Sequence, residues 1–234
     1  MPLLKRPTNK ALISSANTCL DNGHRLLEER YALEFQPLFA TRFYNAMIAQ
    51  EEFAKAFMLL LVKDDVIPFT PHVLRAMNDH ACKQLVGMIM DYIIMNWDET
   101  DQYLEMVRKD LELGDRMPDD VGSALELLRY EKIGRWESRA WVWDDDSNYD
   151  KTALAIAEGK KDRRKQDALY VRIGKDGRVL SLPETTTEAE TKDEEERAGR
   201  YGYLVYSALN GGVQGYRYDK IIAAFKVLFG DPHG

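Results

Sequence analysis

Cysteine is scarce in this chain of 234 residues, which has only Cys19 and Cys82. Two cysteines are too few for a disulfide framework, and neither stands in a Cys-x-x-Cys pair or a Cys/His cluster. The sequence therefore predicts a protein of a reducing compartment without a zinc site. Long apolar runs are also missing, since Phe57–Val62 is far shorter than the roughly 20 residues of a membrane-spanning helix. Because no signal-peptide-like apolar segment opens the chain, we expect a cytoplasmic location and no contact with a membrane.

An excess of positive charge is missing as well, because 39 acidic residues outnumber 32 basic ones and leave a formal net charge of −7. This balance excludes a general electrostatic attraction for nucleic acid, so any RNA binding has to be local. The sequence has no internal repeat, no P-loop and no G-x-S-x-G segment, which excludes the enzyme classes that depend on them. With 45% hydrophobic residues, the chain has the composition of a globular protein.

Helical patterns dominate the first half of the chain. The apolar spacing predicts helices over 8–30, 43–61, 71–95 and 98–112, and Asn22-Gly23 is expected to weaken the first of them. Four such helices complete an up-and-down bundle by about residue 113. We assign this bundle to residues 1–115.

The second half, residues 116–234, is predicted to be a helical appendage packed on that bundle. Its patterns predict a helix from Pro118 and a β-hairpin over about 168–182 with its turn at Asp176-Gly177. A solvated acidic loop over 184–197 is expected to lead into a helix that ends at Leu209. A last amphipathic helix is predicted over 218–229. The predicted fold class is therefore mainly α, with one small hairpin.

Two features of this second half have two interpretations each. The basic run KKDRRK (160–165) suits a solvated helix C-terminus, and it equally suits a local patch for RNA phosphates. Trp136, Trp141 and Trp143 lie within eight positions, where they pack the appendage onto the core or stack RNA bases. The sequence leaves both alternatives open.

The helix over 43–61 is apolar on two faces, which is typical of a central helix or of one shared between a core and an interface. Glu52 lies on the second face, so we expect a partly buried, paired carboxylate there, and a larger loss of stability for Glu52→Ala than for Glu51→Ala. For Glu51, the alternative to a role in a site is an ordinary i,i+4 pair with Lys55. Because the second face needs a partner, the sequence predicts a homodimer on the central helices. The alternative is that the C-terminal helices cover that face.

The helix over 71–95 is expected to carry the chemistry. Arg75 and His80 are five residues apart, about 140° around an ideal helix, so they flank its solvent side with Asp79 and Lys83 between them. A guanidinium in this position can hold a phosphate group and present it to the imidazole. The alternative is an ordinary Arg75–Asp79 pair beside an exposed His80.

Four segments in order carry a family resemblance. They are ALISSANTCLDNGHRLLEE (11–29), AMIAQEEFAKAFMLL (46–60), DHACKQL (79–85) and DALYVRIGKDGRVLSLP (167–183). Together they resemble the AbiV family of prokaryotic abortive-infection proteins, which belongs to the HEPN superfamily of helical domains. The Glu-Glu-x-x-Lys and His-x-x-Lys pieces look like the core motifs of that family. The similarity spans roughly residues 8–183.

The resemblance implies a function in phage defence. Many HEPN proteins are metal-independent endoribonucleases with an Arg-x4–6-His motif at a homodimer interface, and Arg75 and His80 match that spacing. By this resemblance, His80 acts as general acid/base on the ribose 2′-OH or the leaving 5′-oxygen, and Arg75 stabilises charge on the phosphate. The products would carry 2′,3′-cyclic phosphate ends.

The expected site therefore consists of Arg75 and His80 as catalytic residues and needs no metal or cofactor. Its supporting residues are Glu51, Glu52, Lys55, Asp79 and Lys83. The expected partners are an RNA substrate, a second copy of the chain, and a phage-encoded or antitoxin protein. The alternative function is a non-catalytic HEPN module that binds a protein or RNA and arrests growth. The acidic charge favours this alternative, and so does Ala76, because HEPN proteins commonly have a polar residue after the arginine.

Overall fold

The computed structural model describes residues 5–33, 38–95, 118–133 and 149–210, together with Ile222 and Lys226. The elements in chain order are α1 (Asn9–Leu33), α2 (Phe39–Lys63), α3 (Pro71–Ala76), α4 (His80–Met95), α6 (Asp119–Glu126), a π-helical segment (Leu127–Ile133), α8 (Lys151–Ala157), α9 (Lys160–Asp167), β1 (Arg172–Ile173), β2 (Val179–Ser181), a 3-10 turn (Pro183–Thr185) and α10 (Glu188–Leu209). These residues are mainly helical with a two-stranded antiparallel sheet, which confirms the predicted fold class at that level.

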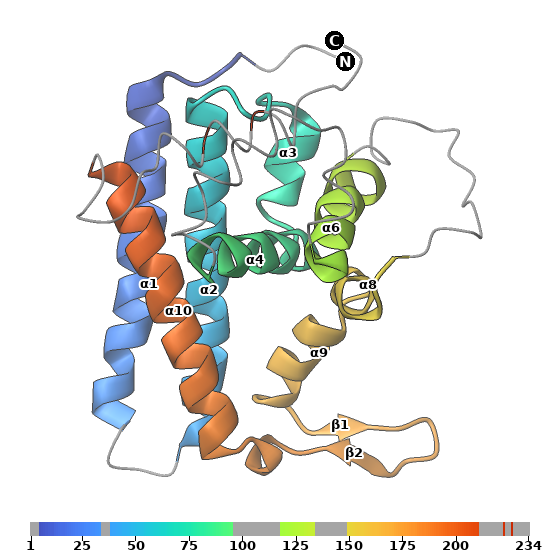
Figure 1. Ribbon diagram of the computed structural model, residues 1–234. Helices are drawn as coiled ribbons and strands as arrows, with labels where there is room; N and C mark the ends of the chain where they lie inside the picture. Colours follow the sequence, from blue (N-terminus) through green and yellow to red (C-terminus); the bar gives the residue numbers. More distant parts are fainter. Residues whose placement is uncertain are drawn as a thin grey trace.

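Helix α2 is the centre of the fold, with α1 and α10 packed along it and α4 crossing it (Figure 1). Its Phe53 and Phe57 are fully buried, so the prediction of a central helix is confirmed. Helix α1 packs against α2, and its Cys19 lies close to Glu52 on the second apolar face of α2. Within one chain, α1 and α10 both pack along α2, so the argument for a dimer from an uncovered face no longer holds, and the homodimer itself stays a prediction.

Helix α1 continues through Gly23, where the sequence predicted a weak point. A Cβ atom at this glycine would lie 2.3 Å from the ring of Phe53, which is far below any van der Waals distance. The glycine thus lets α1 approach α2 closely. The tight packing of the two helices outweighs the cost of glycine in a helix, which is about 1 kcal/mol relative to alanine.

The helix predicted over 71–95 is broken into α3 and α4, which run in different directions (Figure 1). Asp79 starts the second helix, because its Oδ1 accepts a hydrogen bond from the Cys82 amide at 2.8 Å. The apolar stripe expected on this helix is buried in its middle, at Met77, Ala81 and Leu85, but its two ends are not, since Leu74 is 41% exposed and Met95 is 73% exposed. The 140° relation of Arg75 to His80 on one helix is therefore wrong.

The helix that leads into the basic run is also interrupted. Gly159 has a φ of 79°, in the left-handed region that glycine adopts without strain. It separates α8 from α9 and turns the basic run into a short helix of its own, which packs against α2 and α4.

The predicted hairpin is confirmed. Strands β1 and β2 pair antiparallel with Arg172 opposite Ser181, and Gly177 has a φ of 78° in the connecting loop. The hairpin lies at the end of the molecule opposite the described start of the chain (Figure 1). Its apolar side chains are unusually exposed: Tyr170 66%, Val171 52%, Ile173 55%, Val179 54% and Leu180 56%.

The acidic stretch 184–197 is mostly helix, where a solvated loop was predicted. Thr187 and Glu190 form a capping box that starts α10. Glu195 is buried, and Arg42 of α2 binds both of its oxygens, at 2.9 and 2.8 Å. The acidic residues are thus part of the packing between α10 and α2.

Contacts at the other end of α10 join it to α4. The buried Tyr201 hydroxyl donates to the Gly87 carbonyl oxygen at 2.6 Å. A Cβ at Gly87 would lie 3.1 Å from that hydroxyl, so the glycine permits the close approach. Beside it, Arg197 pairs with Asp91 at 3.0 Å. The core therefore runs without a gap from α1 to α10.

Some predictions fall outside the described residues: the helix over 98–112, the Trp136, Trp141 and Trp143 cluster, and nearly all of the helix over 218–229. The division at residue 115 stays a prediction. Within the described ranges, none of the helices combines the length and the hydrophobicity that crossing a bilayer requires.

Candidate functional site

A buried glutamate, Glu51 of α2, is the centre of a cluster of charged side chains. Only 2% of its side chain is exposed. Its Oε2 lies 2.9 Å from Lys83 Nζ and 2.6 Å from His80 Nδ1. Its Oε1 lies 2.6 Å from Lys165 Nζ and accepts a hydrogen bond from Gln84 at 3.3 Å. Both oxygens of this carboxylate are therefore fully partnered.

The two lysines keep Glu51 ionised. Burial alone would raise the pKa of this carboxyl, but the nearby Lys83 and Lys165 ammonium groups lower it from 4.5 to about 2. A carboxylate at this position is thus charged at any physiological pH. It is a fixed acceptor for whatever ring hydrogen His80 presents to it.

His80 is the most exposed member of the cluster, with 51% of its side chain exposed. A carboxylate oxygen at 2.6 Å can only accept, so we assign the ring hydrogen to Nδ1. In the neutral ring this leaves a lone pair on Nε2, and no residue within the described ranges hydrogen-bonds that atom. The carboxylate–imidazole pair is the arrangement by which a general base is oriented in many hydrolytic sites.

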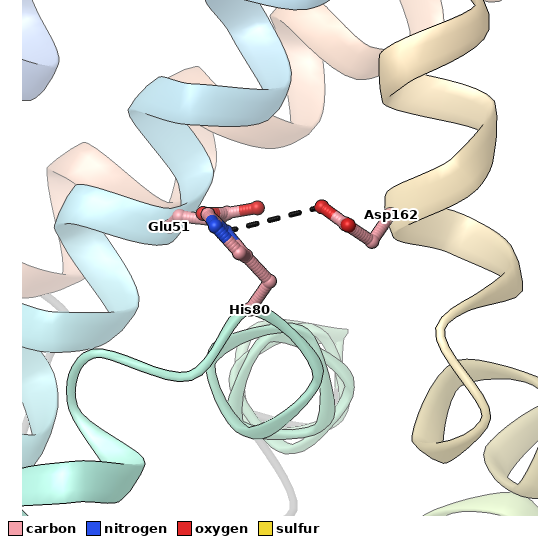
Figure 2. A group of neighbouring side chains, drawn as sticks. All are labelled: Glu51, His80 and Asp162. Carbon is pink, nitrogen blue, oxygen red and sulfur yellow. Dashed lines mark hydrogen bonds and ion pairs between the residues drawn. The ribbon is translucent and has the colours of Figure 1, made fainter.

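Helix α9 supplies the remaining side chains of the cluster. Figure 2 shows Glu51 from α2, His80 from the first turn of α4 and Asp162 from α9 pointing toward one another. Asp162 Oδ1 lies 3.9 Å from His80 Nδ1 and 2.7 Å from Lys165 Nζ. The three helices that carry these residues, α2, α4 and α9, come from separate parts of the sequence.

These three residues also offer donor atoms within 4.8 Å of one another, a spacing that suits a metal ion. The Lys165 ammonium, however, already lies 2.6 Å from Glu51 and 2.7 Å from Asp162. A divalent ion would have to displace or neutralise that charge, since like charges at this distance repel strongly. The cluster therefore fits an ion-pair network better than a metal centre, and the expectation of a metal-free site is kept on this charge argument.

The predicted supporting residues separate into two groups. Glu51 and Lys83 join His80, although Lys83 was expected on the solvent side and is buried. Glu52 and Lys55 pair with each other at 2.7 Å, so the alternative of a Glu51–Lys55 pair is wrong. Glu52 is partly buried, as expected, but Glu51 is more deeply buried, which reverses the predicted order of their effects on stability.

The two remaining predicted residues flank the break between helices. Asp79 caps α4, whereas Arg75 belongs to α3, so the two residues do not lie in one helix. Arg75 is exposed in the last turn of α3, four residues before that cap. The arginine and histidine thus lie on different helices joined by a short turn, an arrangement that the ideal-helix argument did not foresee.

Sequence reasoning missed Lys165 and Asp162. Both belong to the basic run 160–165, which was interpreted as a solvated face or an RNA patch. The solvated-face interpretation is wrong for Lys165, which is buried, and for Arg164, which lies over the Phe43 ring at 4.8 Å and pairs with Glu190. The available signal was the i,i+3 spacing of an acid and a base in a strongly basic run, which alone does not identify a distant partner.

Comparison with known proteins adds nothing to this description, because no family model, no curated protein and no solved structure matches the chain.

Proposed function

We propose that the protein is a metal-independent endoribonuclease of phage defence, as the resemblance to AbiV and HEPN proteins implies, with His80 as its general acid/base. One observation supports this most directly: the exposed His80 ring is bound through Nδ1 to a buried, permanently charged Glu51. An imidazole held in this way offers Nε2 to a substrate in a single orientation. Such positioning is what general base catalysis requires.

In the proposed reaction, His80 Nε2 removes the proton from a ribose 2′-OH. The 2′-oxygen then attacks the adjacent phosphorus, and the bond from phosphorus to the 5′-oxygen breaks. The leaving 5′-oxygen takes up a proton from water, and the protonated His80 returns its proton to the solvent, which gives a 2′,3′-cyclic phosphate and a 5′-OH end. Arg75 stabilises the charge that develops on the phosphate oxygens. No redox step and no metal ion takes part.

The proposed enzyme acts as a homodimer. The apolar-face argument for a dimer no longer holds, but the side of the molecule with Arg75 remains exposed and includes Leu74, which is 41% exposed. A second copy on this side would exclude water from the phosphate site, and it would bring one arginine–histidine pair near the other by two-fold symmetry.

RNA cleavage in the presence of EDTA tests this function. We expect the parent protein to cut RNA and leave cyclic phosphate ends, and His80→Ala and Arg75→Ala to lose at least about 100-fold of the rate. His72→Ala is the matched control, because His72 lies on α3 outside the cluster. Absence of cleavage by the parent, or equal rates for the His80 and His72 variants, would contradict the proposal.

A second candidate function is a binding module that arrests growth without cleavage. The exposed apolar side chains of the β1–β2 hairpin favour it, because contiguous exposed apolar surface commonly marks a protein-binding site. Growth arrest in cells separates the two functions. A binding module retains arrest in His80→Ala and loses it in Ile173→Asp, while a nuclease shows the reverse pattern. Lys175→Asp in the same hairpin controls for the added charge.

A further inference from the structure

We propose that Lys165 of α9 is a positioning residue for His80, so that the second half of the chain completes the site formed by α2 and α4. This inference rests on the proposed function where it concerns catalysis, and on the geometry alone where it concerns the state of the imidazole. Nothing in the family resemblance assigns a role to this lysine.

The burial of Lys165 is the first observation. Its side chain is only 4% exposed, while Lys160 on the same helix is 64% exposed. Lysine is almost never buried unless its charge is paired. Here the ammonium lies 2.6 Å from Glu51 Oε1 and 2.7 Å from Asp162 Oδ1. Two carboxylates thus hold one ammonium in a fixed position.

The second observation is that the two oxygens of the Glu51 carboxylate have different partners. Lys165 takes Oε1, while Oε2 faces His80 and Lys83. Without Lys165, Oε1 would keep only the 3.3 Å contact from Gln84, and the carboxylate would be free to rotate toward the remaining ammonium. Since Oε2 holds the His80 ring by its Nδ1 hydrogen, a rotation of the carboxylate turns the catalytic nitrogen with it.

The third observation is charge beside the imidazole. Lys165 Nζ lies 3.1 Å from His80 Nδ1, where it repels a positively charged ring. The other charged groups close to this position are Glu51 from α2, Asp162 from α9 and Lys83 from α4. Lys161 of α9 interacts electrostatically with Glu51, and Asp79, the residue before His80, caps α4. Removing Lys165 takes away a repulsion and leaves the attraction of the carboxylates, so the charged ring is favoured.

Three variants test the inference. In Lys165→Met we expect the acid limb of the pH–rate profile to move to higher pH by about one unit. In Lys165→Arg, which keeps the charge, the parent profile is largely restored. In Asp162→Asn the limb moves to lower pH, because a negative charge beside the ring is lost. Lys160→Met, on the exposed side of the same helix, leaves the profile unchanged.

Nitrogen NMR of the histidine rings gives a readout that needs no activity. The chain has four histidines, and His80→Ala identifies the signal of interest. The pH at which this signal changes moves up in Lys165→Met and down in Asp162→Asn. If Lys165→Met does not fold, Lys165→Gln, which keeps a polar side chain of similar length, is measured in its place, and a signal unchanged from the parent overturns the positioning role.

The outcomes separate the two proposals. In one outcome the parent does not cut RNA, but the His80 signal moves to higher pH in Lys165→Met and to lower pH in Asp162→Asn. This outcome contradicts the nuclease and supports the positioning role. A parent that cuts RNA, with pH profiles and NMR signals in both variants equal to those of the parent and of Lys160→Met, overturns the positioning role and leaves the nuclease intact.

Discussion

Glu51 and Glu52 are neighbours in the sequence, but their side chains have different surroundings. The Glu51 side chain is 2% exposed and has two lysine partners, whereas Glu52 is 15% exposed and pairs with Lys55 one helical turn away. Partners three or four residues apart can be read from the sequence. Partners from other helices cannot, so the sequence assigned the deeper burial to the wrong glutamate.

This difference predicts the stabilities of two variants. Glu51→Ala leaves Lys83 and Lys165 without their shared carboxylate, which should cost about 3 kcal/mol or more of the free energy of unfolding. Glu52→Ala removes a partly exposed pair and should cost under about 1 kcal/mol. Urea denaturation at neutral pH measures both. Equal midpoints for the two variants would refute the buried network.

The lowered pKa of Glu51 also predicts a pH dependence. In the folded protein the value is about 2, against 4.5 as the ordinary value, so the folded state binds this proton less readily than the unfolded state. Its stabilising contribution is complete above about pH 4.5 and is lost as the pH falls toward 2, on the order of 3 kcal/mol. Other carboxyls titrate in this range, so the parent must be compared with Glu51→Gln. We expect a smaller slope for the variant, and identical slopes would contradict the assignment.

At the scale of single elements, α1 shows how a residue can serve packing against its own propensity. Gly23→Ala places a methyl group 2.3 Å from the Phe53 ring, so either the ring or the helix has to move. We expect a loss of about 1–3 kcal/mol in thermal or urea unfolding. Gly199→Ala in α10 is the control, because its Cβ would meet no atom within 4 Å and should stabilise the helix by up to about 1 kcal/mol. A stabilised Gly23→Ala would contradict the close contact.

The elements that could be predicted are those with local signals. The hairpin follows from Asp176-Gly177 between two β-branched stretches, and α2 follows from its length and its apolar content. The break before α4 was missed because apolar residues continue in helical register across it, and a single Asp79 inside such a pattern is not read as a cap. The start of α10 was missed because its acidic residues suggested solvent, although Thr187 and Glu190 have capping-box spacing.

At the scale of the whole molecule, the candidate site could be predicted only in part. Glu51, His80 and Lys83 were identified from the sequence, because they lie in the two segments that carry the family resemblance. Lys165 and Asp162 were not, since they join the site through the packing of α9 against the helices of the first half. Long-range ion pairs leave no periodic trace in a single sequence.

The proposed dimer is a prediction at this scale. Light scattering at micromolar concentration should give a mass near twice the 27.0 kDa of one chain. Leu74→Lys, on the exposed side of α3, should shift the protein toward the monomer, and Tyr31→Lys should not, because Tyr31 is exposed near the end of α1. A mass of one chain that stays constant as concentration rises would remove the dimer from the proposal.

The distance in sequence between Glu51 and Lys165, 114 residues, has a consequence for the time at which the site forms. A ribosome that adds about 5–20 residues per second needs roughly 6 to 23 seconds to synthesise that stretch. For the last 85 residues of this stretch, after His80 has been added, the growing chain has Glu51 and His80 but lacks the lysine that we propose aligns them. In the proposed nuclease, such a delay would protect the ribosome and the message that are producing it, because the catalytic site would be complete only after most of the polypeptide had been made.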